Sequence, residues 1–241
     1  MELTLPKGIL EEKEHKYYVK GDERVDPSLA LPSVTGIAGY SANSDPKWLI
    51  LWAINAFIET SNKFEWEKRF HEAGKFGTKL HKLISETIQG EHEEQKHPML
   101  ITDEHKTLMK SWSELMNEKK VKFIDSELIV WNPNHLYAGT LDALGEVDGS
   151  ITVFDWKTKN KTGSPDPRHA VQIAGYVLAL EAMTNLQSDP KFIMPEPTRA
   201  AIVYLYKDTG KARWYEVDLL KAKFAFMHCL NLFNIKDYYV K

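Results

Sequence analysis

The chain has 241 residues, which is enough for one domain with an adequate hydrophobic core. Its 43% hydrophobic and 27% charged residues are ordinary for a globular protein and argue against extensive disorder. The formal net charge of -3 excludes a uniformly basic surface, so any site for a polyanion has to be a local basic groove.

The single cysteine, Cys229, and the apolar pattern narrow the class of protein further. A lone thiol forms no internal disulfide and fits a reducing compartment. It also excludes a four-cysteine iron–sulfur cluster. The first residues have no apolar signal core and contain four glutamates by residue 14, unlike a mitochondrial transit peptide. Because no run approaches about 18 apolar residues, we expect no membrane span and a cytoplasmic protein.

The N-terminal half predicts a hairpin followed by helices. Residues 8–20 alternate weakly and residues 20–22 are typical of a turn, which predicts a small hairpin over residues 9–28. Ser33 follows a proline and is the expected N-cap of a helix. Apolar periodicity and capping residues then predict three longer helices, which span residues 46–60, 64–89 and 102–120.

The C-terminal half predicts a sheet. The Asp148-Gly149 pair lies between alternating segments and is a strong signal for a hairpin. Asp166 and Pro167 predict the start of a helix, as N-cap and first helical residue. The remaining strands are expected at residues 121–131, 200–206 and 213–217, with a closing helix at 219–235.

We therefore expect an α/β fold, with a central mixed sheet of four or five strands flanked by helices. No linker divides the chain, so residues 1–241 are expected to form a single domain. Residues 1–120 supply the hairpin and a helical portion, and residues 121–241 supply the sheet core.

The predicted hairpin places two carboxylates on one face. With Val147 facing Ser150, counting outward puts Asp142 opposite Asp155, and Lys157 shares the face of Asp155. Two acids this close repel each other unless a cation lies between them, and oxygen ligands suit Mg2+ or Mn2+. An adjacent lysine can meet a phosphate, so the pattern predicts metal-assisted phosphodiester hydrolysis. The alternative is a solvated hairpin face, because Asp-x-Lys is short and common.

Four short motifs in a fixed order favour the catalytic interpretation. They are Gly77 to His81, Gly139 to Asp142, Asp155 to Lys157, and Gln172 to Tyr176. In this order they resemble the PD-(D/E)xK nuclease superfamily, in particular its RecB-type exonuclease branch, which has a restriction-endonuclease-like core. The chain is similar to exonucleases of the mitochondrial genome-maintenance type and to their phage-encoded relatives.

The resemblance implies roles for the residues of the site. Asp142 and Asp155 would bind Mg2+ or Mn2+ together with His81. The main-chain carbonyl of Trp156 would complete the inner sphere, and Lys157 would position the attacking water. Without the other motifs, a histidine such as His81 at the edge of an apolar stripe is more often a satisfied core residue.

The resemblance also implies contacts with DNA. Gln172 and Tyr176 would orient the active-site region and touch the DNA, while Ser33 and Thr35 would donate hydrogen bonds to a phosphate. The alternatives are a helix cap for Ser33 and a polar border of a core helix for Gln172 and Tyr176. A local basic groove is expected from Lys157, Lys159, Lys161, Arg168 and His169. Lysines such as Lys159 and Lys161 also occur on plain exposed edge strands.

The function implied is that of a metal-dependent exonuclease acting on single-stranded DNA or DNA ends, in replication, recombination or repair. Such an enzyme would work in a bacterial or phage-infected cytoplasm, with DNA and a replication or recombination protein as partners. One alternative is a catalytically inactive nuclease fold that binds DNA or a replication partner. Another is a small-molecule metallohydrolase, which would have a closed pocket in place of a groove.

Overall fold

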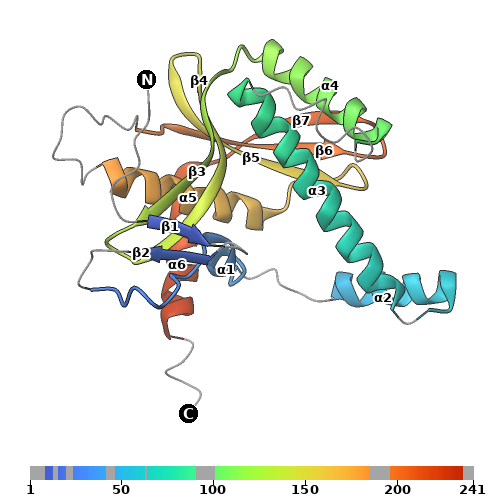
Figure 1. Ribbon diagram of the computed structural model, residues 1–241, viewed down its shortest axis with the longest axis horizontal. Helices are drawn as coiled ribbons and strands as arrows, with labels where there is room; N and C mark the ends of the chain where they lie inside the picture. Colours follow the sequence, from blue (N-terminus) through green and yellow to red (C-terminus); the bar gives the residue numbers. More distant parts are fainter. Residues whose placement is uncertain are drawn as a thin grey trace.

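The computed structural model describes residues 9–12, 16–19, 24–41, 47–62, 64–90, 101–184 and 196–235. Of these, α2 (Lys47–Thr60) lies at the end of a long helix, α3 (Glu65–Gln89), and is remote from the central sheet (Figure 1). None of the helices in the described part of the chain is both long and apolar enough to cross a membrane.

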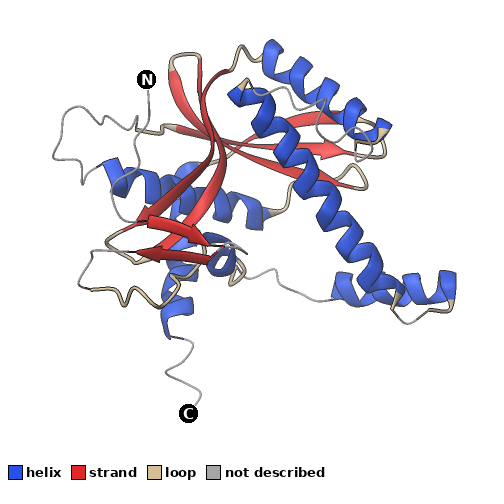
Figure 2. Ribbon diagram, viewed as in Figure 1, coloured by secondary structure: helices blue, strands red, loops and turns tan. Residues whose placement is uncertain are grey.

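A five-stranded mixed sheet forms the centre of the fold (Figure 2). Its strands, in spatial order, are β3 (Lys122–Asn132), β4 (Tyr137–Val147), β5 (Ser150–Lys159), β6 (Arg199–Tyr206) and β7 (Lys211–Glu216). β5 and β6 are parallel and the other neighbours are antiparallel. The parallel pair requires a crossover, which contains α5 (Pro167–Thr184). The predicted mixed sheet is confirmed.

Helices cover both faces of this sheet. On one face, α1 (Val34–Ala38), α5 and α6 (Leu219–Ile235) pack in a cluster that includes Leu141, Leu144 and Val153. On the other face, α3 and α4 (Asp103–Glu118) pack with Phe154 and Trp156. Figure 1 shows the resulting layers, and the predicted α/β architecture is confirmed.

The hairpin of β4 and β5 has the predicted turn and register. Asp148 and Gly149 have φ values of 51° and 76°. Positive values at both positions are what a two-residue type I′ turn requires, and Asn-Gly or Asp-Gly adopts them at low cost. Val147 pairs with Ser150, and the register continues without a shift to Ala143 opposite Phe154.

The N-terminal hairpin exists, with strand bounds that differ from the predicted ones. β1 (Ile9–Glu12) pairs with β2 (Lys16–Val19), and Glu12 lies opposite Lys16. The predicted turn at residues 20–22 lies outside the described residues. Tyr17 and Val19 are buried in the main core, so tertiary packing fixed β2 despite the turn signal at Gly21.

Candidate active site

The strands of the hairpin separate at the site. Backbone pairing between β4 and β5 ends at Ala143 and Phe154, one step before Asp142 and Asp155. β5 continues to pair with β6, so the main chain of Trp156 has lost its partner in β4. The Asp142 side chain takes that place, because its Oδ2 accepts a hydrogen bond from Trp156 N at 2.6 Å. One predicted acid is thereby fixed between the diverging strands.

Asp155 and Lys157 form a buried ion pair two residues apart on β5. Lys157 Nζ donates to Asp155 Oδ1 at 2.8 Å, and Asp155 is only 1% exposed. The other carboxylate oxygen, Asp155 Oδ2, is buried and has no hydrogen-bond partner among the described residues. An orphaned buried acceptor is costly, and it is an unused ligand atom beside a second carboxylate.

The Gly-x-x-x-His motif lies in α3, which approaches the same point from the face of the sheet that α3 and α4 cover. A Cβ atom at Gly77 would lie 3.2 Å from Thr158 Oγ1, so the glycine allows close approach of α3 to β5. One turn later, His81 Nδ1 lies 3.3 Å from Asp142 Oδ1. The side chain of His81 is a quarter exposed, at 25%. The predicted neighbours His81 and Asp142 are thus brought together.

Ionisation in the site is strongly perturbed. Burial raises the pKa of Asp155 to about 6, with the Asp142 carboxylate adding to the rise and Lys157 opposing it. Burial also disfavours charge on Lys157, but the two carboxylates outweigh burial and raise the pKa of its ammonium. For His81, burial is again outweighed, here by Asp142, which raises the imidazole pKa. The mutual effects show that the two acids are electrostatically close.

The donors fit a divalent cation by their chemistry, although they do not form a ready-made cage. Within the described residues, no group of three His, Cys, Asp or Glu side chains converges as a metal site. His81 faces Asp142, and one oxygen of Asp155 faces Lys157. A hard cation would give the Oδ2 of Asp155 the partner that it lacks among the described residues. It would also reduce the repulsion between the Asp155 and Asp142 carboxylates.

The Gln-x-x-x-Tyr helix, α5, lies on the opposite face of the sheet from α3. Gln172 Nε2 donates to Tyr176 Oη at 2.9 Å and to Thr35 Oγ1 at 3.1 Å. Three of the four residues predicted to bind DNA therefore form one connected group. Ser33 is engaged as the cap of α1, because its Oγ accepts from Gly36 N at 3.0 Å. The capping interpretation of Ser33 is confirmed.

Gly139 connects two of the motifs. A Cβ atom at this position would lie 2.6 Å from Cε1 of Tyr176 and 3.1 Å from Cγ2 of Val34. Only a residue without a side chain lets the Tyr176 ring lie against β4 at this point. The glycine of one motif is thus a packing partner of the tyrosine of another.

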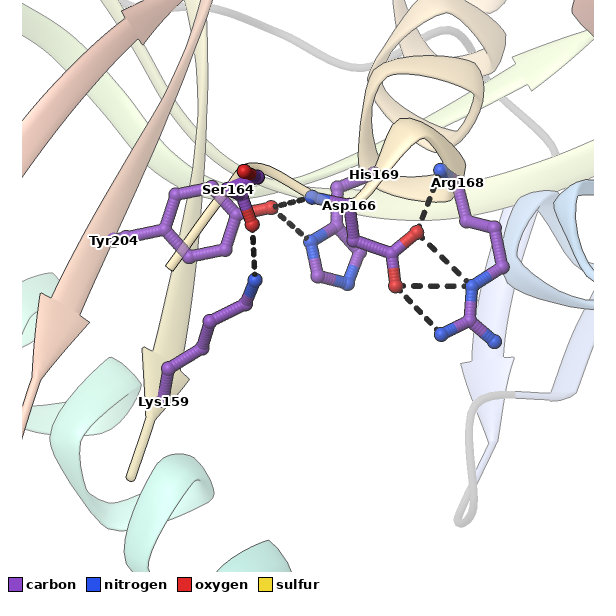
Figure 3. Close-up of polar contacts among 6 residues, drawn as sticks. All are labelled: Lys159, Ser164, Asp166, Arg168, His169 and Tyr204. Atoms are coloured by element: carbon purple, nitrogen blue, oxygen red, sulfur yellow. Dashed lines mark hydrogen bonds and ion pairs between the residues drawn. The ribbon is translucent and has the colours of Figure 1, made fainter. Parts of the chain in front are cut away.

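The predicted basic groove is less basic than its residues suggest (Figure 3). Arg168 is held by Asp166 through both carboxylate oxygens, with the closest contact at 2.6 Å. Burial lowers the pKa of His169 to about 3, and Lys157 and Lys159 add to the effect, so the imidazole is neutral. Lys159 Nζ donates to the carbonyl of Ser164 at 2.9 Å.

Sequence reasoning missed Tyr204, which organises this region. It lies in β6 in register with Lys157 on the neighbouring parallel strand, and it is fully buried. Its hydroxyl contacts Asp166 N at 2.8 Å and His169 Nδ1 at 2.7 Å. The strand Ala200–Tyr206 reads as a continuous apolar run, and only the pairing of β5 with β6 reveals which tyrosine adjoins the lysine.

Two acids and a lysine thus lie at the divergence of two strands, on a mixed sheet covered by helices. The chain belongs to the PD-(D/E)XK nuclease superfamily, whose sequence model matches residues 55–227. Members of this superfamily generally use divalent metals such as Mg2+. The predicted superfamily is therefore confirmed.

Several solved structures are similar to this chain at low sequence identity. One is the crystal structure of SSO0001, with 14% identity over 83% of this chain and 74% of that chain, and a TM-score of 0.38. A second is LHK-Exo in complex with dAMP, with 12% identity over 88% and 91% and a TM-score of 0.43. A third is an alkaline exonuclease, LHK-Exo from Laribacter hongkongensis, with 11% identity over 86% and 90% and a TM-score of 0.42. A search of curated proteins gave no match.

Proposed function

We propose that this protein is a divalent-metal-dependent deoxyribonuclease that acts as an exonuclease on single-stranded DNA or DNA ends, in replication, recombination or repair. The observation that carries the proposal is the buried Asp155 carboxylate, which has one oxygen bound to Lys157 and the other without a partner among the described residues. A purely structural ion pair gains nothing from an orphaned oxygen. A metal-dependent hydrolytic site would use both groups, the free oxygen as a metal ligand and the ammonium beside the phosphate.

Each residue of the site has a definite task in the proposed reaction. Asp142 and Asp155 would hold Mg2+ or Mn2+, with the Trp156 carbonyl and His81 as further ligands. When bound, the cation polarises the scissile phosphoryl group and lowers the pKa of bound water.

Lys157 supplies the remaining charge. Its side chain is 20% exposed, and Nζ is held by Asp155 Oδ1 at 2.8 Å. There it would orient the attacking water and offset negative charge that develops on the phosphate. The acids keep it protonated, since they raise the pKa of its ammonium.

Thr35, Gln172 and Tyr176 would line the path of the DNA. The two donations from the Gln172 amide fix its orientation, and the Thr35 side chain is exposed. Contacts of hydroxyl and amide groups with phosphates position a strand without reading its sequence. Such contacts suit an enzyme that degrades DNA regardless of sequence.

The direct test is the digestion of labelled single-stranded DNA, linear and circular, with Mg2+, with Mn2+ and with a chelator. We expect metal-dependent loss of the linear strand only. Lys157→Ala should reduce the rate by at least about a hundredfold, as expected for loss of one electrostatic group. Lys211→Ala, which removes an exposed lysine at the start of β7, is the matched control.

The outcomes separate the alternatives. Cutting of the circle would indicate an endonuclease. A folded Lys157→Ala variant as active as the parent would refute the catalytic assignment. Binding of DNA without cutting under any metal condition would identify a catalytically inactive nuclease fold.

A further inference from the structure

The first turn of α5 is joined to β6 by hydrogen bonds next to the proposed catalytic lysine. Tyr204 Oη contacts Asp166 N at 2.8 Å and His169 Nδ1 at 2.7 Å (Figure 3). Tyr204 lies in register with Lys157, and its ring also receives Lys159 Nζ at 4.5 Å from the centroid. None of the motifs that define the superfamily site contains Tyr204 or His169.

The hydrogen bonds of Tyr204 bear on where the imidazole carries its proton. A backbone N–H can only donate, so Tyr204 Oη accepts from Asp166 N. The phenol has one proton to donate, and we assign it to His169 Nδ1, which then accepts. A neutral imidazole whose Nδ1 accepts carries its proton on Nε2.

The charges around His169 favour the same neutral form. Lys157, Lys159 and Arg168 oppose protonation and add to the effect of burial, while Asp166 favours protonation and is already occupied by Arg168. The cations prevail, and the pKa of His169 is lowered to about 3. At neutral pH the residue is therefore a fixed, uncharged donor.

The donating atom is free to meet a ligand. His169 Nε2 bonds to no described residue, and it does not belong to the buried polar atoms that lack a partner. The residue as a whole is partly exposed. His169, Gln172 and Tyr176 follow one another at spacings of three and four residues, so they share one face of α5. His169 extends the line of residues that faces the site.

We propose that His169 binds the DNA backbone: its Nε2–H donates a hydrogen bond to an oxygen of a phosphate next to the one that Lys157 meets. Tyr204 and the main chain of Asp166 are the positioning groups that fix the tautomer and the ring. The inference rests on the proposed function, because it requires a DNA strand at Lys157. A neutral donor suits this place, since a further cation would be repelled by Lys157 and Lys159.

The test compares two amide substitutions. In His169→Gln, the amide nitrogen can reach the position of Nε2, whereas in His169→Asn it reaches only the position of Nδ1. Binding of a fluorescent single-stranded DNA oligonucleotide is measured with Ca2+ in place of Mg2+, with the DNA checked to be intact. We expect His169→Ala and His169→Asn to weaken DNA binding about tenfold, which is the typical contribution of a hydrogen bond to a charged group. We expect His169→Gln to retain most of the affinity.

The salt dependence of binding provides a second readout. Loss of a cation from a phosphate lowers the slope of log K against log salt by about one, whereas loss of a neutral donor leaves it unchanged. We expect an unchanged slope for His169→Ala. Tyr204→Phe keeps the ring below Lys159 and removes the hydroxyl, so it should weaken binding as much as His169→Ala, with no further loss in the double variant.

Several results would overturn the inference. They are unchanged affinity in folded His169→Ala, equal losses with Gln and Asn, a slope that falls by about one, or a Tyr204→Phe variant that melts earlier but binds normally. His228→Ala, which removes an exposed histidine on α6, is the control and should bind as the parent does. A parent that cuts DNA while His169→Ala binds normally would refute this inference alone. A parent that neither binds nor cuts DNA would refute the proposed function as well.

Discussion

Substitution of Gly139 by alanine should break the contact between two motifs of the site. The added Cβ would lie 2.6 Å from Cε1 of Tyr176, whereas carbon atoms in contact are about 3.5–4.0 Å apart. The tyrosine ring or β4 must therefore move by about 1 Å. Val34 offers no room on the other side, because its Cγ2 would lie 3.1 Å away. Overpacking of this kind costs about 1–3 kcal/mol of the free energy of unfolding.

A double-mutant cycle measured by urea unfolding assigns the cost to this contact. In the Tyr176→Ala background the ring is absent, so Gly139→Ala should cost less than it does in the parent, with a coupling energy of about 1 kcal/mol or more. Gly163→Ala is the control, because a Cβ there meets nothing within 4 Å. If Gly139→Ala leaves the parent as stable as before and the cycle shows no coupling, the steric argument is wrong.

Other predictions concern packing, metal and pH. Gly175→Ala should destabilise the fold by about 1–3 kcal/mol or more in chemical unfolding, because three ring atoms of Phe226 lie within 2.9 Å of the added Cβ. Gly74→Ala, in the helix α3 with nothing within 4 Å, should stabilise the protein by up to about 1 kcal/mol in the same assay. Mg2+ or Mn2+ should raise the melting temperature of the parent and not that of Asp155→Asn, and an equal rise in both would argue against Asp155 as a ligand. The pKa of His169 is lowered from 6.5 to about 3 in the folded state, so between these two pH values only the unfolded chain binds a proton at this residue. The free energy of unfolding therefore decreases as the pH decreases through this range. From pH 7 to pH 5 this group should cost the parent about 2 kcal/mol, a loss that unfolding curves of His169→Gln should lack.

Local signals in the sequence predicted the parts of the fold that local chemistry decides. The two-residue turn at Asp148 and Gly149 needs positive φ at both residues, which this pair adopts readily. The length of the turn sets Val147 opposite Ser150, and the register follows from there to Ala143 opposite Phe154. The helix start marked by Ser33 was found because its side chain satisfies a backbone N–H group. In these places the determining interaction lies within a few residues of the signal.

Interactions between distant segments could not be predicted in this way. The bounds of the N-terminal hairpin could not be predicted, because β2 is positioned by the burial of Tyr17 and Val19 in the main core. The charge of the basic groove was overestimated because the sequence does not show that His169 is buried between cations. In both cases the sequence gives the residue and the tertiary structure gives its environment.

The divergence of β4 and β5 explains why the motifs are scattered along the chain. If the two strands remained paired, Trp156 N would bond to the β4 backbone, and the Asp142 carboxylate would have no place between them. Because they separate, His81 from the α3 side reaches Asp142, while Lys157 on the α5 side remains beside Tyr204. A site open to both layers has to draw residues from helices on both faces of the sheet. The spacing between motifs then reflects the lengths of the crossover and the covering helices, and the order of the motifs carries more information than any one of them.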